Sequence, residues 1–100
     1  MYFVVSKLTF EAQPTSYDAR ELSQLVDKLR NRFKISVQVS EEFHRSGTAA
    51  LMVAAVHSQE EHLSKLIDDI ADACENSGFG RINSENTILE DFEAFNEEYE

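Results

Sequence analysis

The sequence predicts an α+β fold, the ferredoxin-like βαββαβ plait, in which a four-stranded antiparallel sheet carries two helices on one face. Strand-like and helix-like hydrophobic periods alternate along the chain in the order strand, helix, strand, strand, helix, strand. Two right-handed crossovers place both helices on the same side of such a sheet. The first and third strands are central in this topology, and they are also the two most apolar strands of the chain.

The N-terminal third is predicted to form a strand and a helix. The strand runs from Tyr2 to Glu11, with one face apolar except for Ser6 and the other face starting with Phe3 and Val5. After a break around a proline, apolar residues at helical spacing predict a helix from about Tyr17 to Phe33.

Two strands joined by a polar connection are expected next. Lys34 to Phe43 alternates with period two and follows the helix with almost no loop. Ala49 to Val56 is uniformly apolar, and its alanines make a helix conceivable. The shortness of this run and the turn signals on both sides favour a central strand.

The second helix has the clearest boundaries. Ser58 to Glu61 reads S-x-x-E, a capping box that opens the helix, and an apolar stripe continues to Cys74. Gly78 is placed to close it in the left-handed conformation. A weaker signal from Ile82 to Phe92 predicts a last strand at a sheet edge.

Length and composition indicate one folded domain, residues 1–92, followed by an acidic C-terminal tail, residues 93–100. The hydrophobic share of 42% and the charged share of 28% are ordinary for a globular domain. A single cysteine fits a reducing compartment, no segment resembles a signal peptide, and no apolar run is long enough to span a membrane. We therefore expect a cytoplasmic protein that does not bind membranes.

A net charge of −10 argues against general affinity for nucleic acid, but the basic residues are clustered. Lys28, Arg30, Arg32 and Lys34 lie within seven positions and can contact RNA or another anionic partner. Phe43, His44 and Arg45 in the strand connection can form a recognition tip beside them. The alternatives are cations that compensate the helix dipole, and a loop that buries Phe43 in the core.

The sequence predicts no catalytic residue, metal site, cofactor or small-molecule substrate. His57 and His62 are five residues apart, whereas a helical zinc pair needs a spacing of four. Cys74 falls on an apolar stripe and is expected in the core. The acidic side chains of the second helix are expected to form a solvated face rather than a calcium site, because they lack the loop that such a site needs. The protein is therefore not expected to be an enzyme.

The segment Leu29-Arg30-Asn31-Arg32-Phe33, the strand KISVQV after it and the run GTAALMVAAV together resemble the YlxP-like family of small bacterial proteins of unknown function. The resemblance extends from Tyr2 to about Phe92. It implies a ferredoxin-like fold and a gene neighbourhood shared with translation and ribosome-maturation factors. Where that family often has a basic S-L-K-x-K-R run, this chain has Pro14 to Arg20, which lacks most of the positive charge.

Two functions fit these observations. The first is a non-catalytic interaction module that forms homo-oligomers through its open sheet face, with Phe3 and Val5 as candidate contacts. The second is an RNA- or ribosome-associated factor that uses the basic cluster.

Overall fold

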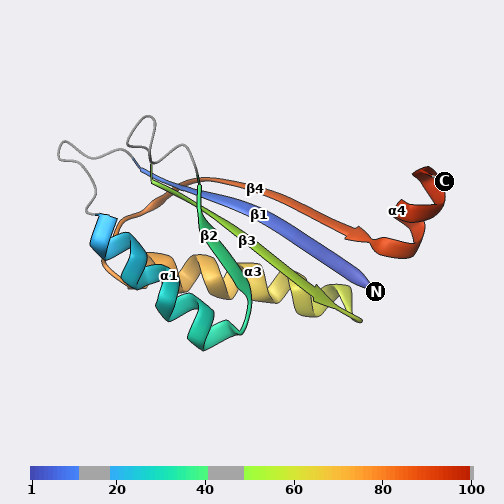
Figure 1. Cartoon of the computed structure of the whole chain (residues 1–100), viewed down its shortest axis with the longest axis horizontal. Coiled ribbons are helices and arrows are strands. Elements are labelled where there is room, and N and C mark those ends of the chain that lie inside the picture. Colours follow the sequence, from blue (N-terminus) through green and yellow to red (C-terminus); the bar gives the residue numbers. More distant parts are fainter. Residues whose placement is uncertain (12–18, 41–48, 100) are drawn as a thin grey trace.

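The computed structural model describes residues 1–11, 19–40 and 49–99. It confirms the predicted α+β architecture and adds a short C-terminal helix (Figure 1). The elements, in chain order, are β1 (Tyr2–Phe10), α1 (Ala19–Phe33), β2 (Ser36–Val39), β3 (Ala50–His57), α3 (Glu60–Asn76), β4 (Ile82–Asp91) and α4 (Phe92–Tyr99).

The four strands form one antiparallel sheet in the order β2-β3-β1-β4. The two apolar strands β1 and β3 are central, as predicted, and the ambiguous alanine-rich run is a strand. Figure 1 shows α1 and α3 on the same side of this sheet. The opposite face is not covered by either helix.

The hydrophobic core lies between the sheet and the helices α1 and α3. Alternate residues of β1 enter it, from Val4 through Leu8 to Phe10, since successive side chains of a strand point to opposite faces. Ser6 is the one polar member of this row, and its hydroxyl oxygen lies 2.8 Å from that of Thr87. The other members of this core cluster are Leu22, Leu25, Val26, Leu29, Val37, Ala49, Leu51, Val53, Leu63, Ile67, Ile70 and Cys74.

The predicted boundaries of α3 are right at one end and wrong at the other. Gly78 has φ +81°, which confirms the left-handed residue after the helix. The N-cap is Gln59, in an extended conformation and without a side-chain capping bond, so Ser58 does not open a capping box. Instead, the Gln59 amide donates to Nδ1 of His57 at 3.0 Å, because the preceding strand extends through His57 and brings this ring next to the first turn.

Residues 92–99, within and next to the predicted acidic tail, form α4. The helix begins directly after β4, and the Glu93 amide donates to Oδ1 of Asp91 at 3.0 Å. The Phe92 amide donates to the carbonyl oxygen of Met1 at 2.9 Å, which ties the start of α4 to the start of β1. No helix in the described ranges is long and apolar enough to cross a membrane.

Candidate interaction site

The uncovered sheet face is apolar at one end only. Phe3 pairs with Val56 of β3, and Val5 lies between Ala54 and Ile88, so these side chains share the face opposite the helices. Phe3 and Val5 are themselves half-buried, whereas Val56 and Ile88 are 68% and 58% exposed. The structure therefore places Phe3 and Val5 on the open face of the sheet, and their neighbours Val56 and Ile88 present more of its apolar surface.

A hollow of about 480 Å³ opens at this end of the sheet, where α4 meets β1 and β3. We call the apolar residues around it, the half-buried Phe3 and the exposed Met1, Val56, Phe92 and Phe95, the apolar patch. The rings of Phe3 and Phe95 meet edge to face, with centroids 5.8 Å apart. Phe92 and Phe95 nevertheless remain 52% and 41% exposed.

The position of α4 shapes this patch. Figure 1 shows α4 at the end of the sheet, turned away from α1 and α3. The N-terminal ammonium of Met1 lies 2.9 Å from Oε2 of Glu93, and this hydrogen bond lowers the pKa of the Glu93 carboxyl group. The aromatic residues at positions 92, 95 and 99 have helical spacing, which is the sequence signal that could have indicated an amphipathic end of the chain.

The other half of the open face mixes polar side chains with Met52. The register places Lys7 between Met52 and Asn86, and Gln38 of β2 lies beyond Met52. An apolar partner would therefore contact the end of the face near α4 rather than its centre.

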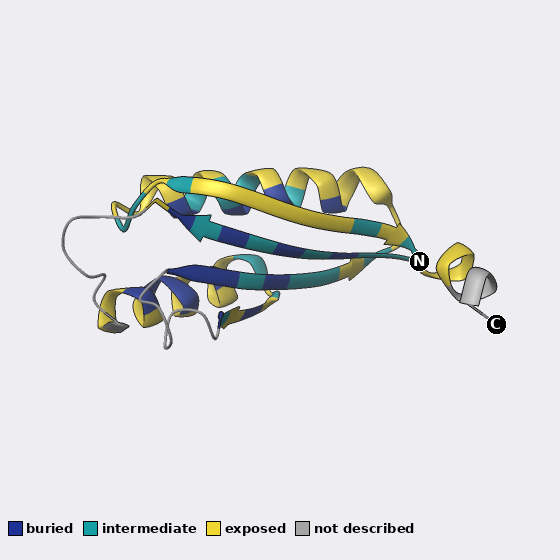
Figure 2. Cartoon of the chain, turned by 90° about the horizontal axis from the view of Figure 1, so that it is seen from above, coloured by how far each residue is buried: buried dark blue, intermediate teal, exposed yellow. Residues whose placement is uncertain are grey.

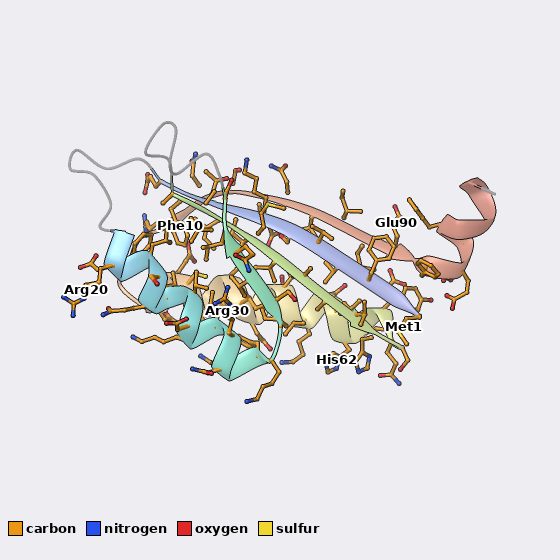
Figure 3. All side chains as sticks on the ribbon, viewed as in Figure 1. Met1, Phe10, Arg20, Arg30, His62 and Glu90 are labelled. Carbon is orange, nitrogen blue, oxygen red and sulfur yellow. The ribbon has the colours of Figure 1, made fainter. Side chains whose placement is uncertain are left out.

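The four cations of the predicted basic cluster have separate roles. Arg30 reaches from α1 to β2, where Nη2 and Nε donate to the Val37 carbonyl oxygen at 2.7 and 3.2 Å (Figure 3). Lys34 adopts φ 56° and its amide donates to the Arg30 carbonyl oxygen, so its backbone makes the tight turn between helix and strand. The Arg32 guanidinium lies 5.0 Å from the Phe33 ring centroid.

Lys28 and Arg32 lie along a hollow of about 590 Å³ between α1 and α3. The two cations are one helical turn apart, and Leu25, Leu29 and Ala73 contribute apolar surface beside them. This pair is the part of the predicted basic cluster that borders a hollow. Phe43, His44 and Arg45 lie outside the described residues.

The remaining candidate groups from the sequence, His57, His62 and Cys74, contact one another or the core. The rings of His57 and His62 are stacked, with centroids 3.8 Å apart and planes inclined by 9°, and Figure 3 shows His62 at the start of α3. Cys74 is fully buried, as predicted, and burial raises the pKa of its thiol to about 12. A thiol with this pKa is protonated at neutral pH and is a poor nucleophile.

The fold and this surface define a ferredoxin-like plait with an apolar patch on its open face. Residues 20–86, more than half of the chain, match the family model DUF503, described as a protein of unknown function. The chain belongs to the DUF503 family. No curated protein matches it.

Among solved structures, the chain is similar to the de novo designed protein Ferredog-Diesel, with a TM-score of 0.50 and 18% sequence identity. The match covers 89% of this chain and 84% of the designed one. At this identity the similarity establishes the fold alone.

Proposed function

We propose that this protein is a non-catalytic interaction module that self-associates through its open sheet face. The observation that carries the proposal is the apolar patch, where four residues that are more than two-fifths exposed, Met1, Val56, Phe92 and Phe95, surround one hollow. Contiguous exposed apolar surface of this kind is characteristic of interaction sites. Aromatic side chains such as those of Phe92 and Phe95 are common anchors in protein interfaces.

The size of the face supports a second copy as the partner. Four strands about 4.8 Å apart, with β1 rising about 3.3 Å per residue over nine residues, give a plan area on the order of 500 Å². The outer surface of α4 adds to this area, and a stable interface buries about 800 Å² per partner. A second copy supplies a face of the same size and the same apolar end.

The charge of the protein predicts how this association responds to salt. Each copy carries a net charge of −10, so two copies repel one another at low ionic strength. Salt screens this repulsion and leaves the apolar contact intact. The self-associated form is therefore expected to become more populated as salt is raised.

We also propose a subgroup within the family and a cellular location for this protein. The LRNRF segment at Leu29 to Phe33 supports membership of the YlxP-like bacterial proteins within the DUF503 family. The single buried thiol, with its raised pKa, supports a cytoplasmic and non-catalytic role.

A second candidate function, association with RNA or the ribosome, is favoured by one observation. Lys28 and Arg32 lie on the same side of α1 along the hollow between the helices, where two phosphates or an anionic protein surface can meet them. Binding of this kind weakens steeply with salt, the opposite of the response expected for self-association.

Mass in solution by light scattering, over a range of protein concentrations and at low and high salt, tests the proposal. Val56→Lys places a charge in the apolar patch, and Gln24→Lys makes the same charge change on exposed α1. We expect the wild type and Gln24→Lys to self-associate, and Val56→Lys to do so at least about tenfold more weakly, since burying a valine contributes about 1.5–3 kcal/mol.

Two outcomes would contradict the proposal. One is a wild-type protein that stays monomeric at every concentration and salt level. The other is equal association of Val56→Lys and the wild type. Co-migration with ribosomal subunits only at low salt, lost in a double variant Lys28→Gln and Arg32→Gln, would support the second candidate instead.

A further inference from the structure

The outer edge of β4 is the longest unpaired strand edge in the described part of the sheet. β4 has ten residues, lies at the end of the strand order and pairs only with β1. Its residues 83–88 are all exposed, as Figure 2 shows along the strand. This edge is a separate surface from the apolar patch.

The hydrogen-bond pattern shows which backbone groups of β4 point outward. The Phe92 amide donates to the Met1 carbonyl oxygen, so this pair is a hydrogen-bonded one. Hydrogen-bonded pairs recur at every second residue of an antiparallel ladder. The backbone amides and carbonyls of Asn86, Ile88 and Glu90 are therefore hydrogen-bonded to β1. The amides and carbonyls of Glu85, Thr87 and Leu89 then point away from the sheet.

The opposite edge of the sheet is short and partly covered. β2 has only four residues, and the Ser40 amide donates to the Ala50 carbonyl oxygen, so the backbone groups of Val37 face outward by the same alternation. The outward carbonyl of Val37 accepts the two hydrogen bonds from Arg30. No comparable side chain covers the outward groups of Glu85, Thr87 and Leu89 among the described residues.

The sequence of β4 carries only part of the usual edge protection. Proteins discourage edge pairing with charged side chains, above all lysine, and with proline, bulges or very short edge strands. β4 contains neither lysine nor proline, and its one irregularity lies at its start, opposite Thr9 and Phe10. Its charged residues are Glu85, Glu90 and Asp91, so their placement limits which registers can form. A free row of amides and carbonyls is a template for another strand.

We propose that the β4 edge pairs with β4 of a second copy, antiparallel about a two-fold axis, and joins two four-stranded sheets into one of eight strands. A two-fold axis normal to the sheet requires opposed residues to point to the same face. The axis therefore passes beside one residue of β4, and this residue lies opposite the same residue of the second copy. The helices of both copies then lie on the same side of the joined sheet.

The charges of β4 favour two registers over the one centred on Ile88. When the pairing is centred on Asn86, Glu85 faces Thr87, and when it is centred on Thr87, Glu85 faces Leu89. Neither register places one acidic residue directly opposite another, whereas centring on Ile88 sets Glu85 against Asp91, which is destabilising. The polar middle of β4 is thus complementary to itself.

This pairing goes beyond the proposed sheet-face association, because it uses backbone groups at the edge and leaves both open faces accessible. Residue-resolved amide hydrogen exchange tests it, at protein concentrations below and above the onset of self-association and at high salt. The outward amides of Glu85, Thr87 and Leu89 are expected to exchange at least about tenfold more slowly in the concentrated sample. The inward amides of Asn86, Ile88 and Glu90 are the control within the same strand, and their exchange should not depend on concentration.

A pair of variants at Glu85 separates edge pairing from other effects. Glu85→Pro removes one outward amide, and proline is tolerated where an edge amide faces solvent. Glu85→Ala removes the same carboxylate and keeps the amide. We expect Glu85→Pro to lose the concentration-dependent protection of Thr87 and Leu89, and Glu85→Ala to keep it, with the inward amides showing that both variants are folded.

The outcomes distinguish the two proposals. Self-association detected by mass, with outward amides that exchange equally fast at all concentrations, would overturn edge pairing and leave the sheet-face proposal standing. Protection of the outward amides in Val56→Lys would support edge pairing without the apolar patch. A protein that is monomeric at every concentration and shows no protection of the outward amides would overturn both proposals. Outward amides that are protected equally at every concentration would overturn edge pairing.

Discussion

Replacing Arg30 by methionine is expected to lower the free energy of unfolding by about 1–2 kcal/mol. The guanidinium group joins the last turn of α1 to β2 through two hydrogen bonds to one acceptor, the Val37 carbonyl oxygen. Methionine keeps much of the aliphatic length of arginine and removes both donors, so the change isolates the hydrogen bonds from the packing of the side-chain stem.

The magnitude follows from the geometry. A hydrogen bond from a charged donor contributes about 1.5–3 kcal/mol when it is sheltered from water. The Arg30 side chain is 43% exposed, so water competes for its donors and the lower part of that range applies. The ion pair with Asp27, at 3.8 Å and exposed, adds at most about 0.5 kcal/mol.

Denaturant and thermal unfolding measure this loss. For a domain of this size, about 1–2 kcal/mol corresponds to a fall in Tm of roughly 4–16 °C. Arg32→Met is the matched control, because Arg32 is also exposed on α1 but donates to no strand carbonyl among the described residues, and it should change stability by less than about 0.5 kcal/mol. Equal stability of the two variants would refute the division of the basic cluster into Arg30, which joins helix to strand, and the pair Lys28 and Arg32, which does not.

Three further predictions concern stability. Burial, with a smaller effect of Glu75, raises the pKa of Cys74 to about 12, so above its ordinary value of 9.0 the unfolded chain loses a proton that the folded protein keeps. Stability should be unaffected by this group below pH 9 and fall by up to about 1.4 kcal/mol per pH unit between pH 9 and 12, measured by denaturant unfolding. Gly78→Ala should cost about 1 kcal/mol, because φ is +81° and no atom would touch the new methyl group. Thr87→Val should cost about 1–2 kcal/mol because it leaves the buried Ser6 hydroxyl unpaired, whereas Ser6→Ala leaves only the exposed Thr87 and should cost less.

Controls are available for each of these. Cys74→Ala should lose the extra decline above pH 9, and an unchanged slope would contradict the role of the thiol. A Gly78→Asn variant should be less destabilised than Gly78→Ala, since asparagine tolerates the left-handed region better. Adding Ser6→Ala to Thr87→Val should recover part of the loss, and a purely additive double variant would contradict the pairing.

The candidate site was only partly predictable from the sequence. The alternation of β1 was enough to place Phe3 and Val5 on one face, because side-chain direction along a strand is local. The contribution of Phe92 and Phe95 to the apolar patch could not be predicted in this way. It depends on the direction in which α4 leaves the sheet, which brings Phe95 next to Phe3, about 90 positions earlier in the chain. The basic cluster shows the same limit, because only the position of β2 decides that Arg30 binds Val37 while Lys28 and Arg32 face the hollow between the helices.

The sequence by itself determined the order of the elements, the central places of β1 and β3, the buried position of Cys74 and the left-handed Gly78. These follow from hydrophobic period and backbone sterics, which act over a few residues. The tertiary structure alone decided that Ser58 does not cap α3, that the acidic end forms α4, and that Arg30 covers an outward carbonyl of β2 while the edge of β4 is exposed. Each of these depends on contacts between segments distant in sequence, and local patterns carry no information about such contacts.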